Sequence, residues 1–148
     1  MQLTQFTDYA LRTLIYVALR KQELCTIAEI AQSYQISKNH LVKVVHRLSQ
    51  LGLLKTTRGN KGGMTLKGDP QKINLGDLIQ TLEPNFYIIE CFDTQNKTCL
   101  ILPACHLKRI LNKAKQNFLQ TLKDYTLADL ITNSNQLNRL FARQRSKK

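Results

Sequence analysis

Residues 26–52 read TIAEIAQSYQISKNHLVKVVHRLSQLG and predict two helices joined by a tight turn. Thr26, with Glu29 three positions later, matches a capping box, in which the hydroxyl and the carboxylate satisfy free backbone N–H groups. Ser37 is expected to cap the start of the second helix with its side chain. The buried face of that helix is expected to comprise Leu41, Val44, Val45, Leu48 and Leu51. Gly52 follows as a typical helix stop with positive φ, so the stretch predicts a helix-turn-helix.

A further helix is expected before this motif and a β-hairpin after it. Residues 6–20 carry apolar side chains at a helical period, namely Phe6, Tyr9, Ala10, Leu14, Val17 and Ala18. Two short strands are expected at 53–57 and 64–66, on either side of the turn RGNKGG at 58–63. The three glycines of this turn allow the backbone to reverse. A hairpin directly after a helix-turn-helix is the wing of a winged helix.

The charge of the chain favours a polyanionic partner. The formal net charge is +12 over 148 residues. Residues 1–67 carry a net charge of +7, residues 68–97 one of −3, and residues 98–148 one of +8. Nucleic acid is the first partner to consider for such a surplus, and an anionic membrane surface the second.

The sequence predicts a cytoplasmic protein with no membrane partner. No apolar run approaches the length of a membrane span, and Asp8 and Arg12 interrupt the N-terminus where a signal peptide needs an apolar stretch. In that compartment thiols stay reduced, so four cysteines are not expected to form structural disulfides.

The second helix of this motif, which begins at Ser37, is expected to bind the major groove of double-stranded operator DNA. The side chains opposite its apolar face are Ser37, Lys38, Asn39, His40, Lys43 and Arg47. Lys and Arg bind guanine acceptors, Asn binds adenine, and Ser37 with the first free N–H groups suits a phosphate. Arg58 and Lys61 in the wing are expected to contact the backbone or the adjacent minor groove. The alternative is that this basic face is only solvated.

Residues 103–123 predict one long amphipathic helix. Its apolar stripe comprises Leu107, Leu111, Ala114, Phe118 and Leu122, a spacing suited to a partner helix. The same helix of a second subunit is the favoured partner, because two-fold DNA sites are bound by two-fold proteins. In the alternative, the stripe packs on the winged helix of its own chain. Thr126 is expected to cap a short helix containing LADLI.

Three cysteines, Cys91, Cys99 and Cys105, lie within fifteen residues, separated by spacers of seven and five residues. Such a cluster indicates a set of metal ligands or a redox device. The close cysteine pairs typical of zinc sites are missing, and wider spacers suit a larger iron–sulfur cluster. Glu90, Asp93 and Asp8 are candidates for a fourth ligand.

Two other classes of function are alternatives to a metal-dependent regulator. In a metal-free thiol switch, the same three cysteines would form disulfides on oxidation. A small metal-dependent enzyme is disfavoured, because the sequence offers no convincing acid/base pair. Cys25, which directly precedes the Thr26 cap, is expected to be a buried structural residue.

The predicted fold class is mainly α with a small β-hairpin: a winged helix-turn-helix plus a long dimerisation helix. The expected parts are a winged helix-turn-helix DNA-binding domain at 1–82, a cysteine cluster-binding loop at 83–106, a dimerisation helix at 104–124, a short C-terminal helical segment at 125–141 and a basic tail at 142–148.

Several motifs occur in order along nearly the whole chain. They are MQLTQFTDYALR at 1–12, SKNHLVK at 37–43, RG-x-x-GG at 58–63, LEP at 82–84, PAC at 103–105 and YTLADL at 125–130. Together they resemble the IscR-like family of winged-helix iron–sulfur regulators, and within it the nitric-oxide-sensing repressors. A regulator of iron–sulfur biogenesis is disfavoured, because Lys108 stands where that subgroup has a histidine.

The resemblance implies a homodimer with an iron–sulfur cluster, [4Fe–4S] in preference to [2Fe–2S], near the subunit interface. The implied ligands are Cys91, Cys99 and Cys105, with Asp8 of the other subunit as the fourth. The implied function is repression of genes for nitric-oxide detoxification, relieved when nitric oxide attacks the cluster. The spacer between Cys91 and Cys99 is longer than expected of the family, whereas the spacer between Cys99 and Cys105 fits.

Overall fold

The structure is a computed structural model and describes residues 2–59, 62–95 and 98–145. The chain divides into two compact units. The winged-helix unit comprises Gln5–Ile73 and the residues from Thr126 onward, and the cysteine unit comprises Asn74–Tyr125 with the residues before Gln5. No helix in the described part of the chain is both long and apolar enough to span a membrane.

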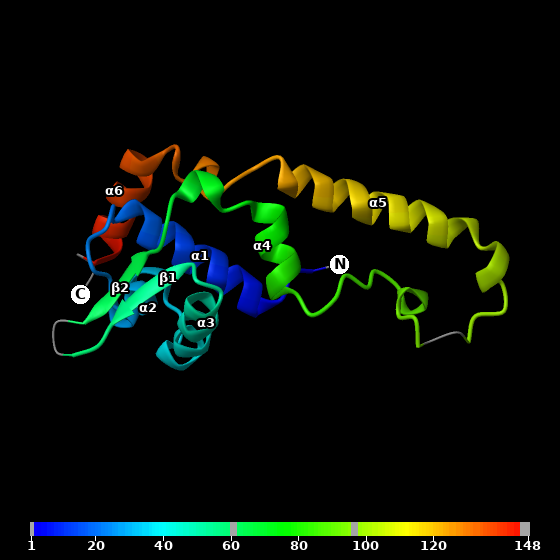
Figure 1. The fold of residues 1–148 in the computed structure, drawn as a ribbon, viewed down its shortest axis with the longest axis horizontal. Coiled ribbons are helices and arrows are strands. Elements are labelled where there is room, and N and C mark those ends of the chain that lie inside the picture. The colour runs from blue at the N-terminus through cyan, green and yellow to red at the C-terminus, as the bar shows by residue number, and fades with distance from the viewer. Residues whose placement is uncertain (1, 60–61, 96–97, 146–148) are drawn as a thin grey trace. The chain divides into compact units, whose positions relative to one another are not determined.

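The helices and strands of the winged-helix unit confirm the predicted fold class of mainly α with a small β-hairpin (Figure 1). They are α1 (Gln5–Leu19), α2 (Ile27–Tyr34), α3 (Lys38–Gln50), β1 (Leu54–Thr57), β2 (Gly63–Leu66), the 3-10 turns η1 (Pro70–Lys72) and η4 (Asp129–Ile131), and α6 (Ser134–Arg145). The helix-turn-helix and its wing therefore lie where the sequence predicts them.

The capping box predicted at the start of α2 is present. The Thr26 hydroxyl accepts a hydrogen bond from the Glu29 N–H at 3.2 Å, and the Thr26 N–H donates to the Glu29 carboxylate at 2.6 Å. Gln35 ends the helix in the left-handed region, with φ of 56°. Ser37 occupies the N-cap of α3, but its side chain makes no capping hydrogen bond, so the prediction is right in position and wrong in contact.

The core of this unit forms where α3 packs on α1. Leu41, Val44 and Leu48 of α3 are almost fully buried, and Leu14 and Val17 of α1 are buried with them. Because these residues recur every three or four positions, one face of α3 is fixed inward and the opposite face outward.

The wing is a two-stranded antiparallel hairpin with Leu54 paired to Leu66 and Thr57 to Gly63. Cys25 extends the hairpin, because its N–H and C=O exchange hydrogen bonds with Met64 at 2.9 and 2.7 Å. The Cys25 side chain is almost fully buried, which confirms its predicted structural role. These backbone bonds join the chain before α2 to the second strand of the wing.

The C-terminal region differs from the prediction. The expected helix over LADLI is the short 3-10 turn η4, which begins where the Thr126 N–H and hydroxyl both donate to the Asp129 carboxylate. These hydrogen bonds hold the pKa of Asp129 below its usual range. Helix α6 then continues to Arg145, across the expected start of a basic tail at residue 142. Residues 146–148 lie outside the described part of the chain.

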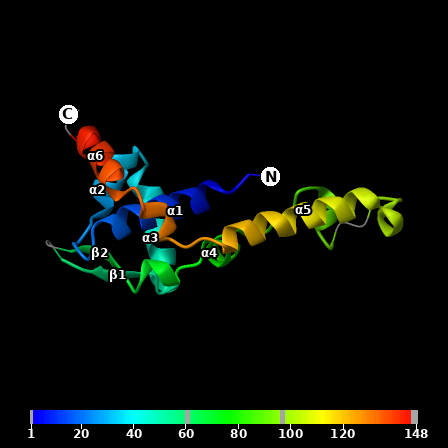
Figure 2. The ribbon, with the colours of Figure 1, turned by 90° about the horizontal axis from the view of Figure 1, so that it is seen from above.

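Helix α6 is joined to the winged helix by an aromatic cluster. The Phe141 ring meets the rings of Tyr16 and Tyr34 edge-on, each with 5.2 Å between centroids. Figures 1 and 2 agree in placing α6 beside α2, to which Tyr34 belongs. The side chain of Phe141 is only 9% exposed, so the end of the expected C-terminal helical segment is packed on the winged helix.

We predict that Phe141→Ala destabilises the protein by about 3–5 kcal/mol, because it empties the centre of this aromatic cluster. The measurement is the free energy of unfolding from urea titration. Leu140→Ala is the matched control on the same helix, since Leu140 is 53% exposed, and its effect should stay within about 0.5 kcal/mol. Equal effects of the two substitutions would contradict the packing described for α6.

The cysteine unit consists of two helices with a long loop between them. Its elements are α4 (Leu75–Leu82), the 3-10 turns η2 (Glu90–Phe92) and η3 (Leu102–Ala104), and α5 (His106–Lys123). Helix α4 packs against α5, and the segment from Glu83 to Cys105 connects the two helices. The sequence placed α4 with the DNA-binding domain, whereas its contacts group it with α5.

Candidate nucleic-acid interface and cysteine site

The outward face of α3 gathers all the residues predicted to contact DNA from this helix. Ser37, Lys38, Asn39, His40, Lys43 and Arg47 are all exposed. The apolar stripe of α3 is buried, apart from Leu51, which is the half-buried C-cap residue of the helix. This face therefore offers three cationic side chains and an amide from one helix, the set of donors that the major groove and its phosphates can bind.

Two exposed residues of this face were not among the predicted contacts. Val42 and His46 lie four and eight positions after Lys38 and are both exposed. Their spacing already places them on the outward face, so the helical period could have identified them. His40 differs from its neighbours because its ring lies 6.0 Å from that of Tyr9 on α1.

The wing contributes Arg58, which is exposed at the end of β1. The turn is tight, because the Gly62 N–H donates to the Gly59 carbonyl at 2.8 Å. A side chain at position 62 would collide with the backbone carbonyl of Thr57, so only glycine fits there. Lys61, the other predicted wing contact, lies outside the described residues.

The three clustered cysteines are free thiols on three different parts of the cysteine unit. Cys91 is half-buried within η2, and Cys99 is exposed in the loop. Cys105 is the N-cap of α5, where its sulfur accepts a hydrogen bond from the Lys108 N–H at 3.4 Å. Within the described residues, no three His, Cys, Asp or Glu side chains lie close enough together to hold a metal ion. The donor types suit a metal site, but this conformation does not gather them.

One contact fixes the segment around Cys91 against α5. The Lys115 ammonium lies 4.8 Å from the centre of the Phe92 ring, a cation–π contact next to Cys91 in sequence. Of the two predicted carboxylate ligands in the loop, Asp93 accepts a hydrogen bond from the Gln95 N–H at 2.9 Å and thereby shapes a turn. Glu90, the other, begins η2 beside Cys91.

Asp8, the remaining carboxylate candidate, lies in the first turn of α1 and is held by Arg12. The two carboxylate oxygens accept hydrogen bonds from Arg12 Nε at 2.9 Å and from Nη2 at 2.8 Å. Both side chains are more than 40% exposed. An ion pair between two side chains this exposed contributes at most about 1 kcal/mol to the stability of the fold. Asp8 can therefore leave Arg12 for another partner at a low cost in free energy.

Arg12 also lies over the Tyr34 ring, with 5.8 Å from its guanidinium carbon to the ring centre. Burial raises the pKa of Tyr34 to about 12, and the charge of Arg12 opposes this rise. Tyr34 is therefore neutral over the physiological pH range and serves as a packing residue between α1 and α6.

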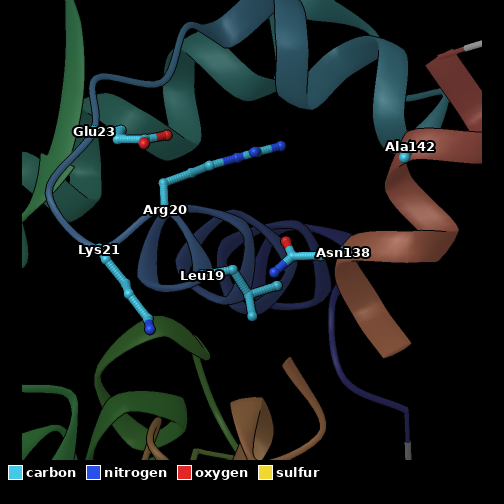
Figure 3. Close-up of a pocket in the computed structure, with 6 residues that line it drawn as sticks. All are labelled: Leu19, Arg20, Lys21, Glu23, Asn138 and Ala142. Carbon is cyan, nitrogen blue, oxygen red and sulfur yellow. The ribbon is translucent and has the colours of Figure 1, made fainter. Parts of the chain in front are cut away.

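A groove of about 360 Å³ lies beside the end of α1, as Figure 3 shows. Its lining residues are Leu19, Arg20, Lys21, Glu23, Asn138 and Ala142. Arg20 points toward the side of Ala142, whereas Lys21 points away. The Arg20 guanidinium donates to the Tyr16 hydroxyl at 3.0 Å and lies 4.8 Å from the centre of that ring. Arg20 is therefore already engaged by Tyr16, and the groove is lined by the end of α1 and by residues of α6.

Helix α5 has an apolar stripe but no buried residue. Leu107 and Ile110 are exposed, and so are Leu100 and Ile101 in the loop before the helix. Ile110 was not part of the predicted stripe, although it lies three positions after Leu107. Leu111, Phe118 and Leu122 of the predicted stripe are half-buried, so in this chain alone the apolar side of α5 is uncovered mainly near the start of the helix.

A winged helix with a basic outer face on α3, joined to a unit that carries three free thiols, defines a helix-turn-helix transcriptional regulator. The model of the Rrf2 family, described as an iron-dependent transcriptional regulator, matches residues 3–133. The chain therefore belongs to the Rrf2 family, and it is a regulator rather than an enzyme.

Similar proteins confirm the resemblance found in the sequence motifs. The HTH-type transcriptional regulators NsrR of Bacillus subtilis (strain 168) and Oceanobacillus iheyensis are 48% and 49% identical to this chain. The matches cover 95% and 93% of this chain and 97% and 94% of those proteins. NsrR of Shouchella clausii is 44% identical, with 95% of each chain covered.

Solved structures confirm the fold. CymR (YrzC), the global cysteine regulator of B. subtilis, matches with a TM-score of 0.72 and 24% identity, over 90% of this chain and 98% of that one. T. potens IscR matches with a TM-score of 0.69 and 22% identity, over 90% and 88%.

The α4–α5 contact, which joins the two ends of the cysteine loop, depends on Gly76. A Cβ atom there would collide with the Lys123 side chain and would lie 2.8 Å from the Lys123 backbone nitrogen. We predict that Gly76→Ala lowers the free energy of unfolding by about 1–3 kcal/mol, although the same change in an exposed helix stabilises. Thermal and urea unfolding measure this effect. Gln80→Ala, at an exposed position of α4, is the control. An unchanged or raised free energy of unfolding of Gly76→Ala would refute the close contact between α4 and Lys123.

Proposed function

We propose that this protein is a cytoplasmic, homodimeric repressor that binds operator DNA through α3 and the wing. We propose further that an iron–sulfur cluster controls this binding and that nitric oxide is the effector. The observation that carries the proposal is the presence, in one chain, of an exposed basic face on α3 and three free cysteines around the start of α5. The high identity to regulators named NsrR supports the same conclusion.

Helix α3 is suited to the major groove because its charges point away from the core. Lys38, Lys43 and Arg47 are exposed cations on a helix whose other face is buried, so they can approach DNA without disturbing the fold. Asn39 at the start of the helix offers both a donor and an acceptor, as bidentate binding of adenine requires. We propose that Arg58, exposed directly after β1, makes a backbone or minor-groove contact.

Lys43→Ala is predicted to weaken binding to a duplex site that the wild-type protein selects from a randomised library. In a plot of the logarithm of the binding constant against the logarithm of salt concentration, the slope of the variant should also be about one unit shallower than that of the wild type. The reason is that one phosphate contact is lost. Fluorescence anisotropy at several salt concentrations measures both quantities. Lys72→Ala, an exposed lysine of η1, is the control. Unchanged affinity and slope in Lys43→Ala would remove this residue from the interface.

We propose that α5 pairs with the same helix of a second subunit. The stripe beginning at Leu107 includes exposed apolar side chains, and Ile110 adds to it at 64% exposed. Covering such a surface is favourable, at roughly 25 cal/mol for each Å² of apolar area buried. A dimer would also present two α3 helices to a two-fold operator, whose successive major grooves lie roughly 34 Å apart.

The chemistry of the three thiols fits an iron–sulfur cluster. None of them forms a disulfide, and Cys105 stands at the N-terminus of α5. We propose Cys91, Cys99 and Cys105 as ligands and Asp8 of the other subunit as the fourth, a role for which Asp8 would leave Arg12. A bound cluster supplies iron that reacts with nitric oxide, and [4Fe–4S] is favoured over [2Fe–2S].

The loop must close to bring these sulfurs together, and this chain limits where the movement can occur. Phe92 is fixed on α5 by Lys115, and Cys105 is fixed at the start of the same helix. The longer Cys91–Cys99 spacer would then have to bring Cys99 to the other two sulfurs. Its extra length is tolerable because the cost of closing a loop grows slowly with length.

Cys99→Ala tests whether the metal and DNA binding are coupled. We predict that the anaerobically purified variant loses most of its iron and acid-labile sulfide, and loses affinity for the selected duplex with them. Iron and sulfide analysis and fluorescence anisotropy measure the two effects. Cys25→Ala is the matched control, because it removes a thiol that is buried beneath the wing.

Three results would change this reading. A variant without iron but with full affinity would separate cluster binding from DNA binding. A wild-type protein without iron and sulfide, even after reconstitution, would favour the thiol switch, in which dithiothreitol alone restores DNA binding. Wild-type absorbance that nitric oxide fails to bleach would reject nitric oxide as the effector.

A further inference from the structure

Val42 is the one large apolar side chain of α3 that is not buried. It is 52% exposed, whereas Leu41, Val44, Val45 and Leu48 of the same helix are at most 6% exposed. It lies four positions after Lys38, three after Asn39 and four before His46, so these exposed polar residues surround it on the outward face.

The fold gains nothing from valine at this position. A β-branched side chain loses rotamer freedom in a helix, and an exposed valine buries little surface in return. Lysine or glutamine, which fill other outward positions of α3, would be better helix formers and better solvated. A requirement outside the fold would explain the residue.

The major groove contains one apolar group among its base edges, the C5-methyl group of thymine. A branched aliphatic side chain between a lysine and an asparagine is suited to contact that methyl while its neighbours bind phosphates or base acceptors. We propose that Val42 contacts a thymine methyl in each half of the operator and so determines specificity at that base pair. This inference rests on the proposed binding of DNA by α3.

A protein partner is the less suitable occupant of this position. A stable protein interface needs an apolar centre of several side chains, whereas Val42 is a single one. Its surroundings also carry the cations Lys38 and Lys43, which favour a polyanion.

The test replaces each thymine of the selected duplex in turn by deoxyuridine, which removes only the methyl group. Binding of the full-length, anaerobically purified wild-type protein should weaken about four-fold at one symmetry-related pair of positions, the equivalent of one buried methyl group. Val42→Ala should bind the unmodified duplex about four-fold more weakly and should be indifferent to deoxyuridine at that pair. It should melt at or slightly above the wild-type temperature and keep the wild-type salt dependence. Gln32→Ala, at an exposed position of α2, is the control and should remain sensitive.

The outcomes separate this inference from the proposed function. If the wild-type protein binds the selected duplex but no deoxyuridine substitution weakens it, the methyl contact does not exist. If Val42→Ala remains as sensitive as the wild type at the affected pair, another residue makes the contact. If no duplex is selected and none is bound, binding of DNA by α3 fails, and the inference fails with it.

Discussion

The packing of one face of α3 against α1 is the constraint on which the DNA-binding arrangement depends. Leu41, Val44 and Leu48 are almost fully buried, and their spacing leaves a single rotation of the helix about its axis. A rotation by one residue, about 100°, would bury charged side chains and expose leucines, at a cost of several kcal/mol. The outward direction of Lys38, Lys43 and Arg47 therefore follows from the core, and mutation within the core would alter the proposed interface without touching it.

Elements whose buried residues recur at a regular spacing within one segment are the parts of the fold that the sequence could predict. The helices α1 to α3 and the wing carry their signals locally, as apolar periodicity, a capping box and glycines at the turn. Helix α6 carries little local signal, because Phe141 is its main buried residue and its partners, Tyr16 and Tyr34, are distant in sequence. The side-chain cap expected of Ser37 failed for a related reason, since position at a helix start does not by itself fix a side-chain rotamer.

The candidate site likewise has one part that the sequence could predict, on α3, and one part that it could not, around the cysteines. Exposure of the predicted residues of α3 follows from the helical period and could be predicted one residue at a time. The geometry of the three cysteines could not, because it depends on a loop without regular periodicity and on whatever the thiols bind. Asp8 shows the same limit: its ion pair with Arg12 follows from their spacing of four on α1, but its proposed role as a ligand requires a second subunit.

How a change at the cysteines would reach α3 can be argued from the stiffness of the cysteine unit. Cys105 caps an 18-residue helix, about 27 Å long, so a displacement at its start is carried to its end rather than absorbed. At that end α4 lies so close that only glycine fits at position 76, and the Asn74 amide donates to the Lys123 carbonyl at 2.6 Å. The C-cap residue of α4 is Glu83, whose carboxylate accepts hydrogen bonds from the N–H and hydroxyl of Thr4. Thr4 directly precedes α1, the helix on which α3 is packed, so the chain itself links the cysteine unit to the DNA-binding helices.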